Sequence, residues 1–120
     1  MSAIANLEIA RAWLRAFNAA DVDALVALYD DDATHTSPKI RALHPDTGGR
    51  LAGKAALTAW WKGAIARLPG LRYEATALTA DDARVVLEYV RHAQGEPPML
   101  VAEAFEVRAG RIVASRVYHG

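Results

Sequence analysis

The chain has 120 residues, of which 52% are hydrophobic and 23% are charged, and its 14 Lys and Arg residues balance 14 Asp and Glu residues. This length and composition are typical of a soluble globular protein, and we expect a single domain over residues 1–120. The balanced charge gives no electrostatic footprint for nucleic acid or for an anionic membrane, so neither is an expected partner.

Cysteine is absent, which excludes disulfide bonds, thiolate catalysis and cysteine-ligated zinc. The N-terminal segment has neither the basic start nor the apolar core of a signal peptide. No stretch of the sequence approaches the ~18 apolar residues that a membrane span needs. The expected location is therefore the cytoplasm.

The first half of the chain has the hydrophobic spacing of helices. Apolar residues recur at spacings of three, four and seven over residues 3–18, which predicts a first helix. A second helix over residues 22–29 is expected to take Asp21 as its N-cap and to end in an acidic run. A third helix is expected over residues 53–68, where a Pro-Gly pair ends it.

Between the second and third helices the pattern changes. Residues 33–37 alternate and predict a short strand, which Pro38 ends. Residues 39–51 contain a cluster of turn formers and are predicted to be a loop, longer than most connections in a compact domain. This loop is either a plain surface loop or a lid over a ligand. A lid could bring Lys39, Arg41, His44 or Asp46 over the ligand.

The second half of the chain alternates with the period of strands. Four strands are predicted over residues 71–79, 84–92, 99–108 and 111–119, joined by short turns. Consecutive strands with such connections form an antiparallel meander. Helices followed by a meander indicate an α+β fold.

Residue parity sorts the two faces of this meander. The odd-numbered face is largely apolar, and we assign it to the side under the helices; by this rule Val113 faces inward and Ile112 outward. Its polar exceptions are Tyr89, Arg91, Glu103, Ser115 and His119. The even-numbered face mixes apolar residues with charges of both signs, which is typical of a subunit interface, so we expect a homodimer through this outer face.

Three segments carry a resemblance to a known family: residues 11–34, a Gly-Lys-x-Ala-Leu helix start at residues 53–57, and the final meander strand at residues 110–118. They resemble the polyketide-cyclase-like (SnoaL-like) branch of the nuclear transport factor 2-like superfamily, over nearly the whole chain. The resemblance implies a cone-shaped, curved antiparallel sheet wrapped on three N-terminal helices, with a cavity at its open end. The superfamily includes ketosteroid isomerase, limonene-epoxide hydrolase and scytalone dehydratase, so its fold does not give the function.

The resemblance to ketosteroid isomerase places that enzyme's functional residues on this chain. Its general-base aspartate falls on Ser37, its oxyanion-hole tyrosine on Trp13, and its second oxyanion donor, an aspartic acid, on Glu103. A serine cannot act as that base unaided, and an indole cannot replace the phenol, so steroid isomerase activity is not expected. The resemblance still implies where these residues lie: Ser37 and Glu103 should face the cavity.

Arg91 and Glu103 are expected on one inward face of paired strands. Either they form a structural ion pair, or Arg91 binds a carboxylate or enolate while Glu103 acts as an acid or base. Among Met99, Val101 and Phe105, the Glu103 carboxyl should have a raised pKa unless Arg91 offsets it.

His35 and His119 are the histidines expected to face inward, where an imidazole suits proton transfer near neutral pH. Each is either a satisfied hydrogen-bonding residue or, together with Glu103, part of an acid–base site; a metal site of two histidines and one carboxylate is a weaker alternative without a motif. The expected catalytic residues are His35, Arg91, Glu103 and His119, and the expected ligand-binding residues are Trp13, Ser37, Trp60, Tyr89 and Ser115. Of Trp60 and Trp61, one is expected in the core. No metal or cofactor is predicted.

Two functions follow from this cluster of polar residues on an apolar face. The first is a cofactor-free isomerase, cyclase, dehydratase or hydrolase that uses acid–base chemistry on a small, mostly apolar molecule with an oxygen function. The second is a non-catalytic small-ligand-binding or dimerisation module in which the polar groups satisfy one another. The sequence alone leaves both open.

Overall fold

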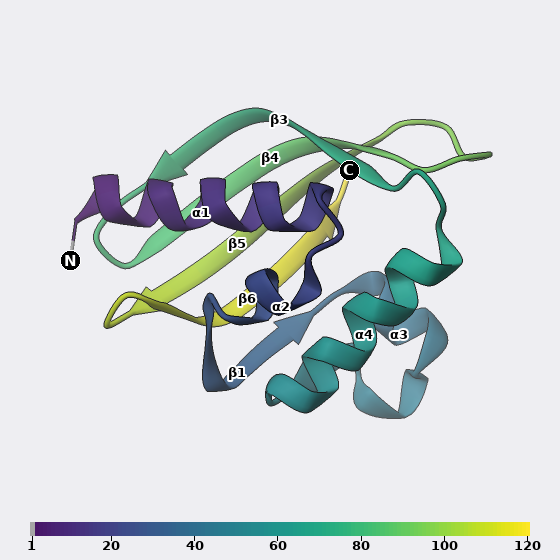
Figure 1. Ribbon diagram of the computed structural model, residues 1–120, viewed down its shortest axis with the longest axis horizontal. Coiled ribbons are helices and arrows are strands. Elements are labelled where there is room, and N and C mark those ends of the chain that lie inside the picture. Colours follow the sequence, from purple (N-terminus) through teal and green to yellow (C-terminus); the bar gives the residue numbers. More distant parts are fainter. Residues whose placement is uncertain (1) are drawn as a thin grey trace.

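Helix α1 (Ala3–Asn18) opens the fold of the computed structural model, which describes residues 2–120. The Ser2 side chain caps the helix by accepting a hydrogen bond from the Ala5 amide, which satisfies one of the free N–H groups of the first turn. The helix runs along one face of the sheet and packs against β3 and β4 (Figure 1). Its buried stripe consists of Asn6, Ala10, Trp13, Ala16 and Phe17.

The second helix is shorter than predicted. Helix α2 (Val22–Val26) has the expected cap, because the Asp21 carboxylate accepts a hydrogen bond from the Ala24 amide. Strand β1 (Tyr29–Thr36) then begins where helix was expected. Tyr29 is fully buried and pairs with β6, so sheet pairing outweighs the helical spacing of the preceding residues.

The predicted loop over residues 39–51 was wrong, because the segment is largely structured. It contains helix α3 (Pro38–Leu43), the short 3₁₀ helix η1 (Pro45–Thr47) and strand β2 (Arg50–Ala52). The Ser37 hydroxyl accepts a hydrogen bond from the Lys39 amide, and a proline in the first turn is already set to a helical φ. A Ser-Pro pair is therefore a helix start here rather than only the end of a strand.

The remaining elements confirm the third helix and the meander. Helix α4 (Lys54–Arg67) is followed by β3 (Arg72–Ala80), β4 (Arg84–His92), β5 (Met99–Arg108) and β6 (Arg111–His119). The six strands form one sheet in the order β2-β1-β6-β5-β4-β3. Its neighbours are antiparallel except for β1 and β6, which run parallel. The α+β fold class is confirmed.

The parity assignment is confirmed except at the start of β6. Residues at odd positions of β4 and β5 face the helices and are largely buried. In β6, however, Ile112 is fully buried and Val113 is only half-buried, so their predicted faces were wrong. Val107 pairs with Ile112 whereas Glu106 pairs with Ala114. The extra residue forms a bulge, which reverses the parity on one side of it.

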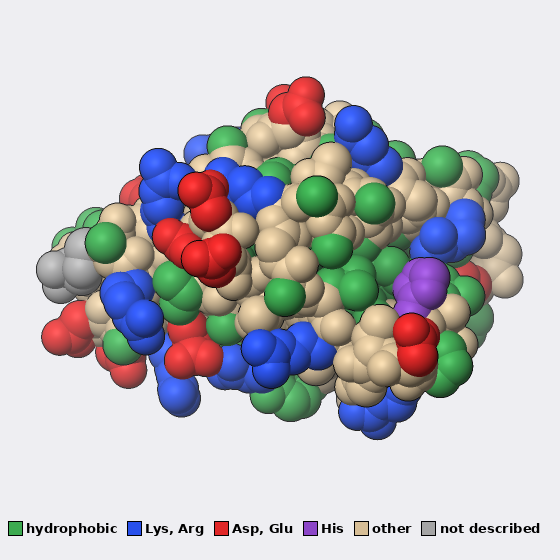
Figure 2. Space-filling view, turned by 90° about the horizontal axis from the view of Figure 1, so that it is seen from below, with side chains coloured by type: hydrophobic (Ala, Val, Ile, Leu, Met, Phe, Trp, Pro, Cys, Tyr) green, Lys and Arg blue, Asp and Glu red, His purple; other side chains and the backbone are tan. Residues whose placement is uncertain are grey.

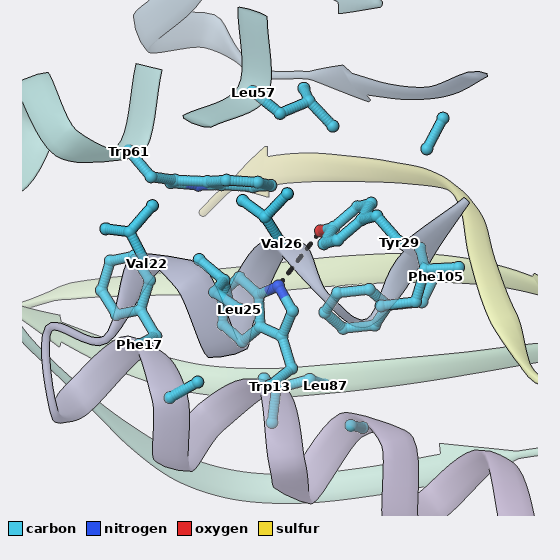
Figure 3. Close-up of a cluster of buried hydrophobic side chains, with 14 of the residues drawn as sticks. Trp13, Phe17, Val22, Leu25, Val26, Tyr29, Leu57, Trp61, Leu87 and Phe105 are labelled. Atoms are coloured by element: carbon cyan, nitrogen blue, oxygen red, sulfur yellow. Dashed lines mark hydrogen bonds between the residues drawn. The ribbon is translucent and has the colours of Figure 1, made fainter. Parts of the chain in front are cut away.

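The core lies between α1, α2, α4 and the inner face of the sheet. Figure 3 shows Trp13 and Phe17 of α1 facing Tyr29, Trp61 and Phe105. On the face of the molecule shown in Figure 2, positive and negative side chains are interspersed around exposed hydrophobic groups. Within residues 2–120, no helix is long and apolar enough to cross a membrane.

Candidate functional site

A cavity of about 300 Å³ lies between the inner face of the sheet and helices α1, α3 and α4. This volume is at the small end of the range for ligand pockets and suits a small organic molecule. Much of the wall is aromatic, with polar side chains set into it. The aromatic residues that line the cavity are Trp13, Phe17, Trp60, Trp61, Tyr73 and Tyr89.

Four of these rings form a continuous stack from α1 to the sheet. Trp13 stacks on Phe17 with 5.2 Å between ring centroids, Phe17 on Tyr73 at 4.0 Å, and Tyr73 on Tyr89 at 4.1 Å. Offset stacking of this kind holds the rings in fixed positions. The stack therefore gives one side of the cavity a rigid, apolar wall against which the apolar part of a ligand can pack.

Glu103 is a buried acid in the cavity wall, with an exposed fraction of 1%. The Tyr89 hydroxyl donates a hydrogen bond of 3.0 Å to its Oε1 atom. Oε2 has no hydrogen-bond partner among residues 2–120 and lies 4.0 Å from His35 Nδ1. Burial raises the pKa of Glu103 to about 8, although the hydrogen bond from Tyr89 opposes this rise. The predicted rise is confirmed, and the carboxyl is mostly protonated at neutral pH. Because Oε1 accepts from Tyr89, the proton belongs on Oε2.

His35 lies at the end of a buried chain of hydrogen bonds that crosses three elements. The Trp13 indole donates to the Tyr29 hydroxyl at 3.1 Å (Figure 3). Tyr29 and the Ser115 hydroxyl are 2.9 Å apart, and Ser115 lies 2.6 Å from His35 Nδ1. Burial lowers the pKa of His35 to about 3, so the ring is neutral.

The direction of this chain follows from its first member. An indole N–H can only donate, so the Tyr29 oxygen accepts from Trp13. Among residues 2–120, Ser115 is the hydrogen-bonding neighbour that can take the buried Tyr29 proton, so Tyr29 donates to Ser115. Ser115 in turn donates to His35 Nδ1. In this arrangement every hydroxyl proton is used, and the imidazole proton of His35 lies on Nε2. His35 lines the cavity, so Nε2 is its remaining donor for a ligand.

Arg91 does not pair with Glu103, and that alternative from the sequence was wrong. Its guanidinium instead forms an ion pair with Glu96, at 2.7 Å between Nη1 and Oε1. Glu96 lies in the turn between β4 and β5, a segment without periodic structure. Arg91 and Glu103 both line the cavity, but they are separate groups with separate partners.

His119 also lines the cavity and is half-buried. Its pKa is lowered, first by burial and then by the positive charges of Lys39 and Arg91, so it is neutral at neutral pH. No group of three His, Asp or Glu residues within the described part of the chain is arranged to hold a metal ion. The site of two histidines and one carboxylate considered from the sequence is not assembled.

The predicted ligand-binding residues divide into two groups. Trp13, Ser37, Trp60 and Tyr89 line the cavity, whereas Ser115 is fully buried behind His35 and does not. The Ser37 hydroxyl is engaged in capping α3. Trp60 and Trp61 both line the cavity and both belong to the buried core, so the expectation that one of them lies in the core is confirmed.

The segment predicted as a lid or a plain loop is partly a cover for the cavity. Helix α3 presents Lys39, Ala42 and Leu43 to it. His44 and Asp46 instead line a separate hollow on the outer side of α4. Of the four polar residues considered for a lid, only Lys39 is among those lining the cavity.

Sequence reasoning missed three residues that shape the site. Tyr29 was placed in a helix, Tyr73 was not assigned to a face, and Glu96 was part of a turn. Tyr73 occupies an odd position of β3 and pairs with Arg91, so extending the parity rule to β3 would have found it. The sequence carries no comparable signal for Glu96.

The model of the SnoaL-like domain matches residues 10–115 of this chain. The chain belongs to the SnoaL-like family. No curated protein sequence matches it at a significant level. Comparison of the structure with solved structures gives many matches.

A SnoaL-like protein of unknown function from Burkholderia thailandensis is 28% identical, with a TM-score of 0.89 over 100% of this chain and 99% of that one. TerC, crystallised with polyporic acid, is 18% identical with a TM-score of 0.83 over 97% of this chain and 92% of that one. A Catenulispora acidiphila protein with a ketosteroid isomerase-like fold, in complex with trimethylamine, is 22% identical with a TM-score of 0.74 over 92% and 84%.

These matches confirm the resemblance to the nuclear transport factor 2-like superfamily and its SnoaL-like branch. The second and third similarities, at below 25% identity, are similarities of fold. The SnoaL-like fold accommodates different site residues, so the function of this chain has to be argued from its own cavity.

Proposed function

We propose that this SnoaL-like protein binds a small, mostly apolar molecule with an oxygen function and transforms it by cofactor-free acid–base chemistry, as an isomerase, cyclase, dehydratase or hydrolase. The observation that supports this most is Glu103, a buried carboxyl in the wall of an aromatic cavity, one of whose oxygens has no hydrogen-bond partner among residues 2–120. Such a group costs stability when it is left unsatisfied. Strongly shifted pKa values of this kind gather at functional sites.

Two donors meet the ligand in this proposal. The Glu103 Oε2–H and the His35 Nε2–H donate to the oxygen of a carbonyl group, and they stabilise the negative charge that develops there when a neighbouring C–H bond breaks. The stack of Trp13, Phe17, Tyr73 and Tyr89 holds the apolar part of the ligand. Both donors are neutral, so they impose no full positive charge on the bound ground state.

His119 is the proposed base. Its lowered pKa keeps the imidazole neutral and able to accept a proton. The electron pair of the broken C–H bond moves onto the carbonyl oxygen and gives an enolate. Return of the proton from protonated His119 to another carbon of a conjugated enolate completes an isomerisation. In a dehydration, the enolate instead expels a β-hydroxyl group, which takes this proton from His119 and leaves as water.

Similar structures support the ligand part of the proposal. TerC was crystallised with polyporic acid, and the Catenulispora acidiphila protein was crystallised with trimethylamine. Proteins of this fold thus bind small organic molecules of different chemistry. The aromatic cavity of this chain has a suitable size for the same use.

A ligand screen followed by matched variants tests the proposal. Thermal-shift measurements with small phenols, lactones and carboxylates identify ligands, because specific binding stabilises the folded state. With a substrate so found, Glu103→Gln and His119→Ala should each lower kcat/KM about 100-fold or more. The control Glu88→Gln makes the same chemical change on an exposed residue of β4 and should leave it unchanged. Full activity in both cavity variants would contradict the assignment.

A non-catalytic binding module is the second candidate, because several polar groups of the cavity satisfy one another. Arg91 is paired with Glu96, Ser37 caps α3, and His35 Nδ1 is bonded to Ser115. The two functions differ in one observable. A catalyst exchanges the acidic C–H protons of a bound ketone for deuterium in D₂O, whereas a module binds the ketone and leaves them unexchanged.

We also propose a homodimer through the outer face of the sheet. Leu100 and Tyr118 are 68% and 55% exposed there, next to a hydrogen-bonded Arg116–Glu106 pair that joins β5 and β6. A dimer should give twice the monomer mass in light scattering, and Leu100→Lys should shift it toward the monomer. Ile4→Lys, at an exposed site on α1, is the control. A monomer mass for the natural chain at micromolar concentration would reject the dimer.

The cytoplasmic location stays a prediction that cell fractionation would test.

A further inference from the structure

The charged side chains that line the cavity are unequal in sign. Lys39 of α3, Arg67 of α4 and Arg91 of β4 are cations from three different elements. The acidic residues lining the same cavity are Glu96 and Glu103. The raised pKa of Glu103 leaves it mostly uncharged at neutral pH. In a protein without net charge, this cavity is therefore locally positive, which favours an anionic ligand.

Arg91 is the most deeply placed of these cations. Its side chain is 5% exposed, whereas that of its partner Glu96 is 36% exposed. A guanidinium carries five N–H donors in a planar fork and is costly to bury without a partner. Among residues 2–120, its hydrogen-bond partner is the Glu96 carboxylate, through one nitrogen. The Tyr73 hydroxyl lies near the same guanidinium, and the N–H groups that Glu96 does not use are available for a second carboxylate or for a replacement of the first.

Glu96 is held in a way that permits replacement. It lies in the turn between β4 and β5, next to Gly95 with a φ of 81° and ahead of two prolines. Its backbone amide is bonded to the Ala93 carbonyl, so the turn persists without the ion pair. The buried guanidinium needs a negatively charged partner, but the Glu96 carboxylate is partly exposed and can return to solvent when another carboxylate takes its place. A ligand carboxylate that forms two parallel hydrogen bonds to the fork can displace it.

The two ends of the cavity are joined by the aromatic stack. Arg91 is opposite Met99, and Glu103 is opposite Leu87, four residues away in the β4–β5 register, which is about 13 Å at the backbone. Both side chains line the cavity, so a ligand that contacts both has to be elongated. Tyr73 pairs with Arg91 and stacks on Tyr89, the donor to Glu103.

We propose that the natural ligand is an aromatic or conjugated carboxylic acid whose carboxylate replaces Glu96 on Arg91 while its second oxygen function meets Glu103 and His35. This inference rests on the proposed function for the location of the ligand. It adds the substrate class, an oxygen-bearing carboxylate anion. It also gives Glu96 a role as the internal competitor that occupies Arg91 when the cavity is empty.

Calorimetric titration with 4-hydroxycinnamate and its neutral amide tests the inference. The natural chain should bind the acid about tenfold more tightly than the amide. Glu96→Gln removes the competing carboxylate and should raise the affinity for the acid about tenfold further, whereas the affinity for the amide should change less than about twofold. The control Glu88→Gln removes one negative charge on the outer face of β4, the strand of Arg91, and should change the affinity for neither the acid nor the amide. Arg91→Met should abolish the preference for the acid, provided that its circular dichroism shows a native fold.

Equal affinity for acid and amide, or an acid affinity that Glu96→Gln does not raise, would overturn the inference. So would the absence of binding of either compound to both the natural chain and Glu96→Gln at millimolar concentration. Glu103→Gln distinguishes this outcome from failure of the proposed function. If Glu96→Gln acts as expected while Glu103→Gln leaves turnover unchanged, the anion site stands and the acid–base role of Glu103 fails.

Discussion

Replacing Glu103 with Gln should remove an unusual dependence of stability on pH. The pKa of Glu103 is about 8 in the folded protein and 4.5 for an ordinary glutamate. Between these values the folded state holds a proton that the unfolded chain has released. The free energy of unfolding therefore falls as pH rises through this window, with the contribution complete below 4.5 and lost above about 8. At about 1.4 kcal/mol per pH unit, the whole window corresponds to about 5 kcal/mol.

His35 gives a slope of the opposite sign over a lower range. Its pKa is about 3 in the fold against an ordinary 6.5, so the unfolded chain takes up a proton that the fold excludes. Its contribution is present above 6.5 and is lost as pH falls toward 3. Between 4.5 and 6.5 the two slopes oppose each other, and Glu103 alone acts between 6.5 and 8. The range from pH 6.5 to 8 is therefore where Glu103→Gln reports on Glu103 without interference from His35.

Urea denaturation followed by tryptophan fluorescence measures the effect. From pH 6.5 to 8 the natural chain should lose about 2 kcal/mol of unfolding free energy, whereas Glu103→Gln should lose almost none. Gln preserves the shape of the protonated acid, and its oxygen can accept from Tyr89. Glu88→Gln, at an exposed position, should follow the natural chain. Parallel curves for the natural chain and Glu103→Gln would refute the reasoning, since they would show that Glu103 is ionised in the fold.

Two further predictions concern the neighbours of Glu103. Tyr29→Phe removes the hydroxyl that joins Trp13 to Ser115 and should lower the free energy of unfolding by about 1–3 kcal/mol. The control Tyr118→Phe, at an exposed site, should lower it by less than about 0.5 kcal/mol. Equal losses in the two variants would contradict the buried chain of hydrogen bonds. Arg91→Met should raise the pKa of His119 in an NMR titration, because it removes a nearby positive charge, and an unchanged titration would place Arg91 outside the electrostatic range of His119.

The helices and the meander were predictable because each depends on local periodicity. Helix α1 and strands β4 to β6 follow from hydrophobic spacing that tertiary contacts reinforce. The errors lie where long-range pairing decides. Tyr29 begins a strand because β6 is available beside it, and Ile112 faces inward because a bulge shifts the register. Neither event has a signature within a single segment.

The site was predictable to the same extent. Parity correctly placed Arg91, Glu103 and His119 toward one cavity, and burial of a carboxyl among apolar neighbours correctly predicted its raised pKa. The partners were not predictable. Glu96 reaches Arg91 from an aperiodic turn, and the chain from Trp13 to His35 joins segments up to about a hundred residues apart in sequence. Only the folded arrangement brings those groups together.

The protonation state of Glu103 in the folded protein decides whether the cavity holds a neutral acid. Carbon-13 NMR of protein labelled at the glutamate carboxyl carbons, compared with Glu103→Gln, identifies its signal through a pH titration. We expect one carboxyl that is protonated at neutral pH and titrates at about 8. A Glu103 signal that titrates near the ordinary 4.5 and is fully ionised at neutral pH would contradict it.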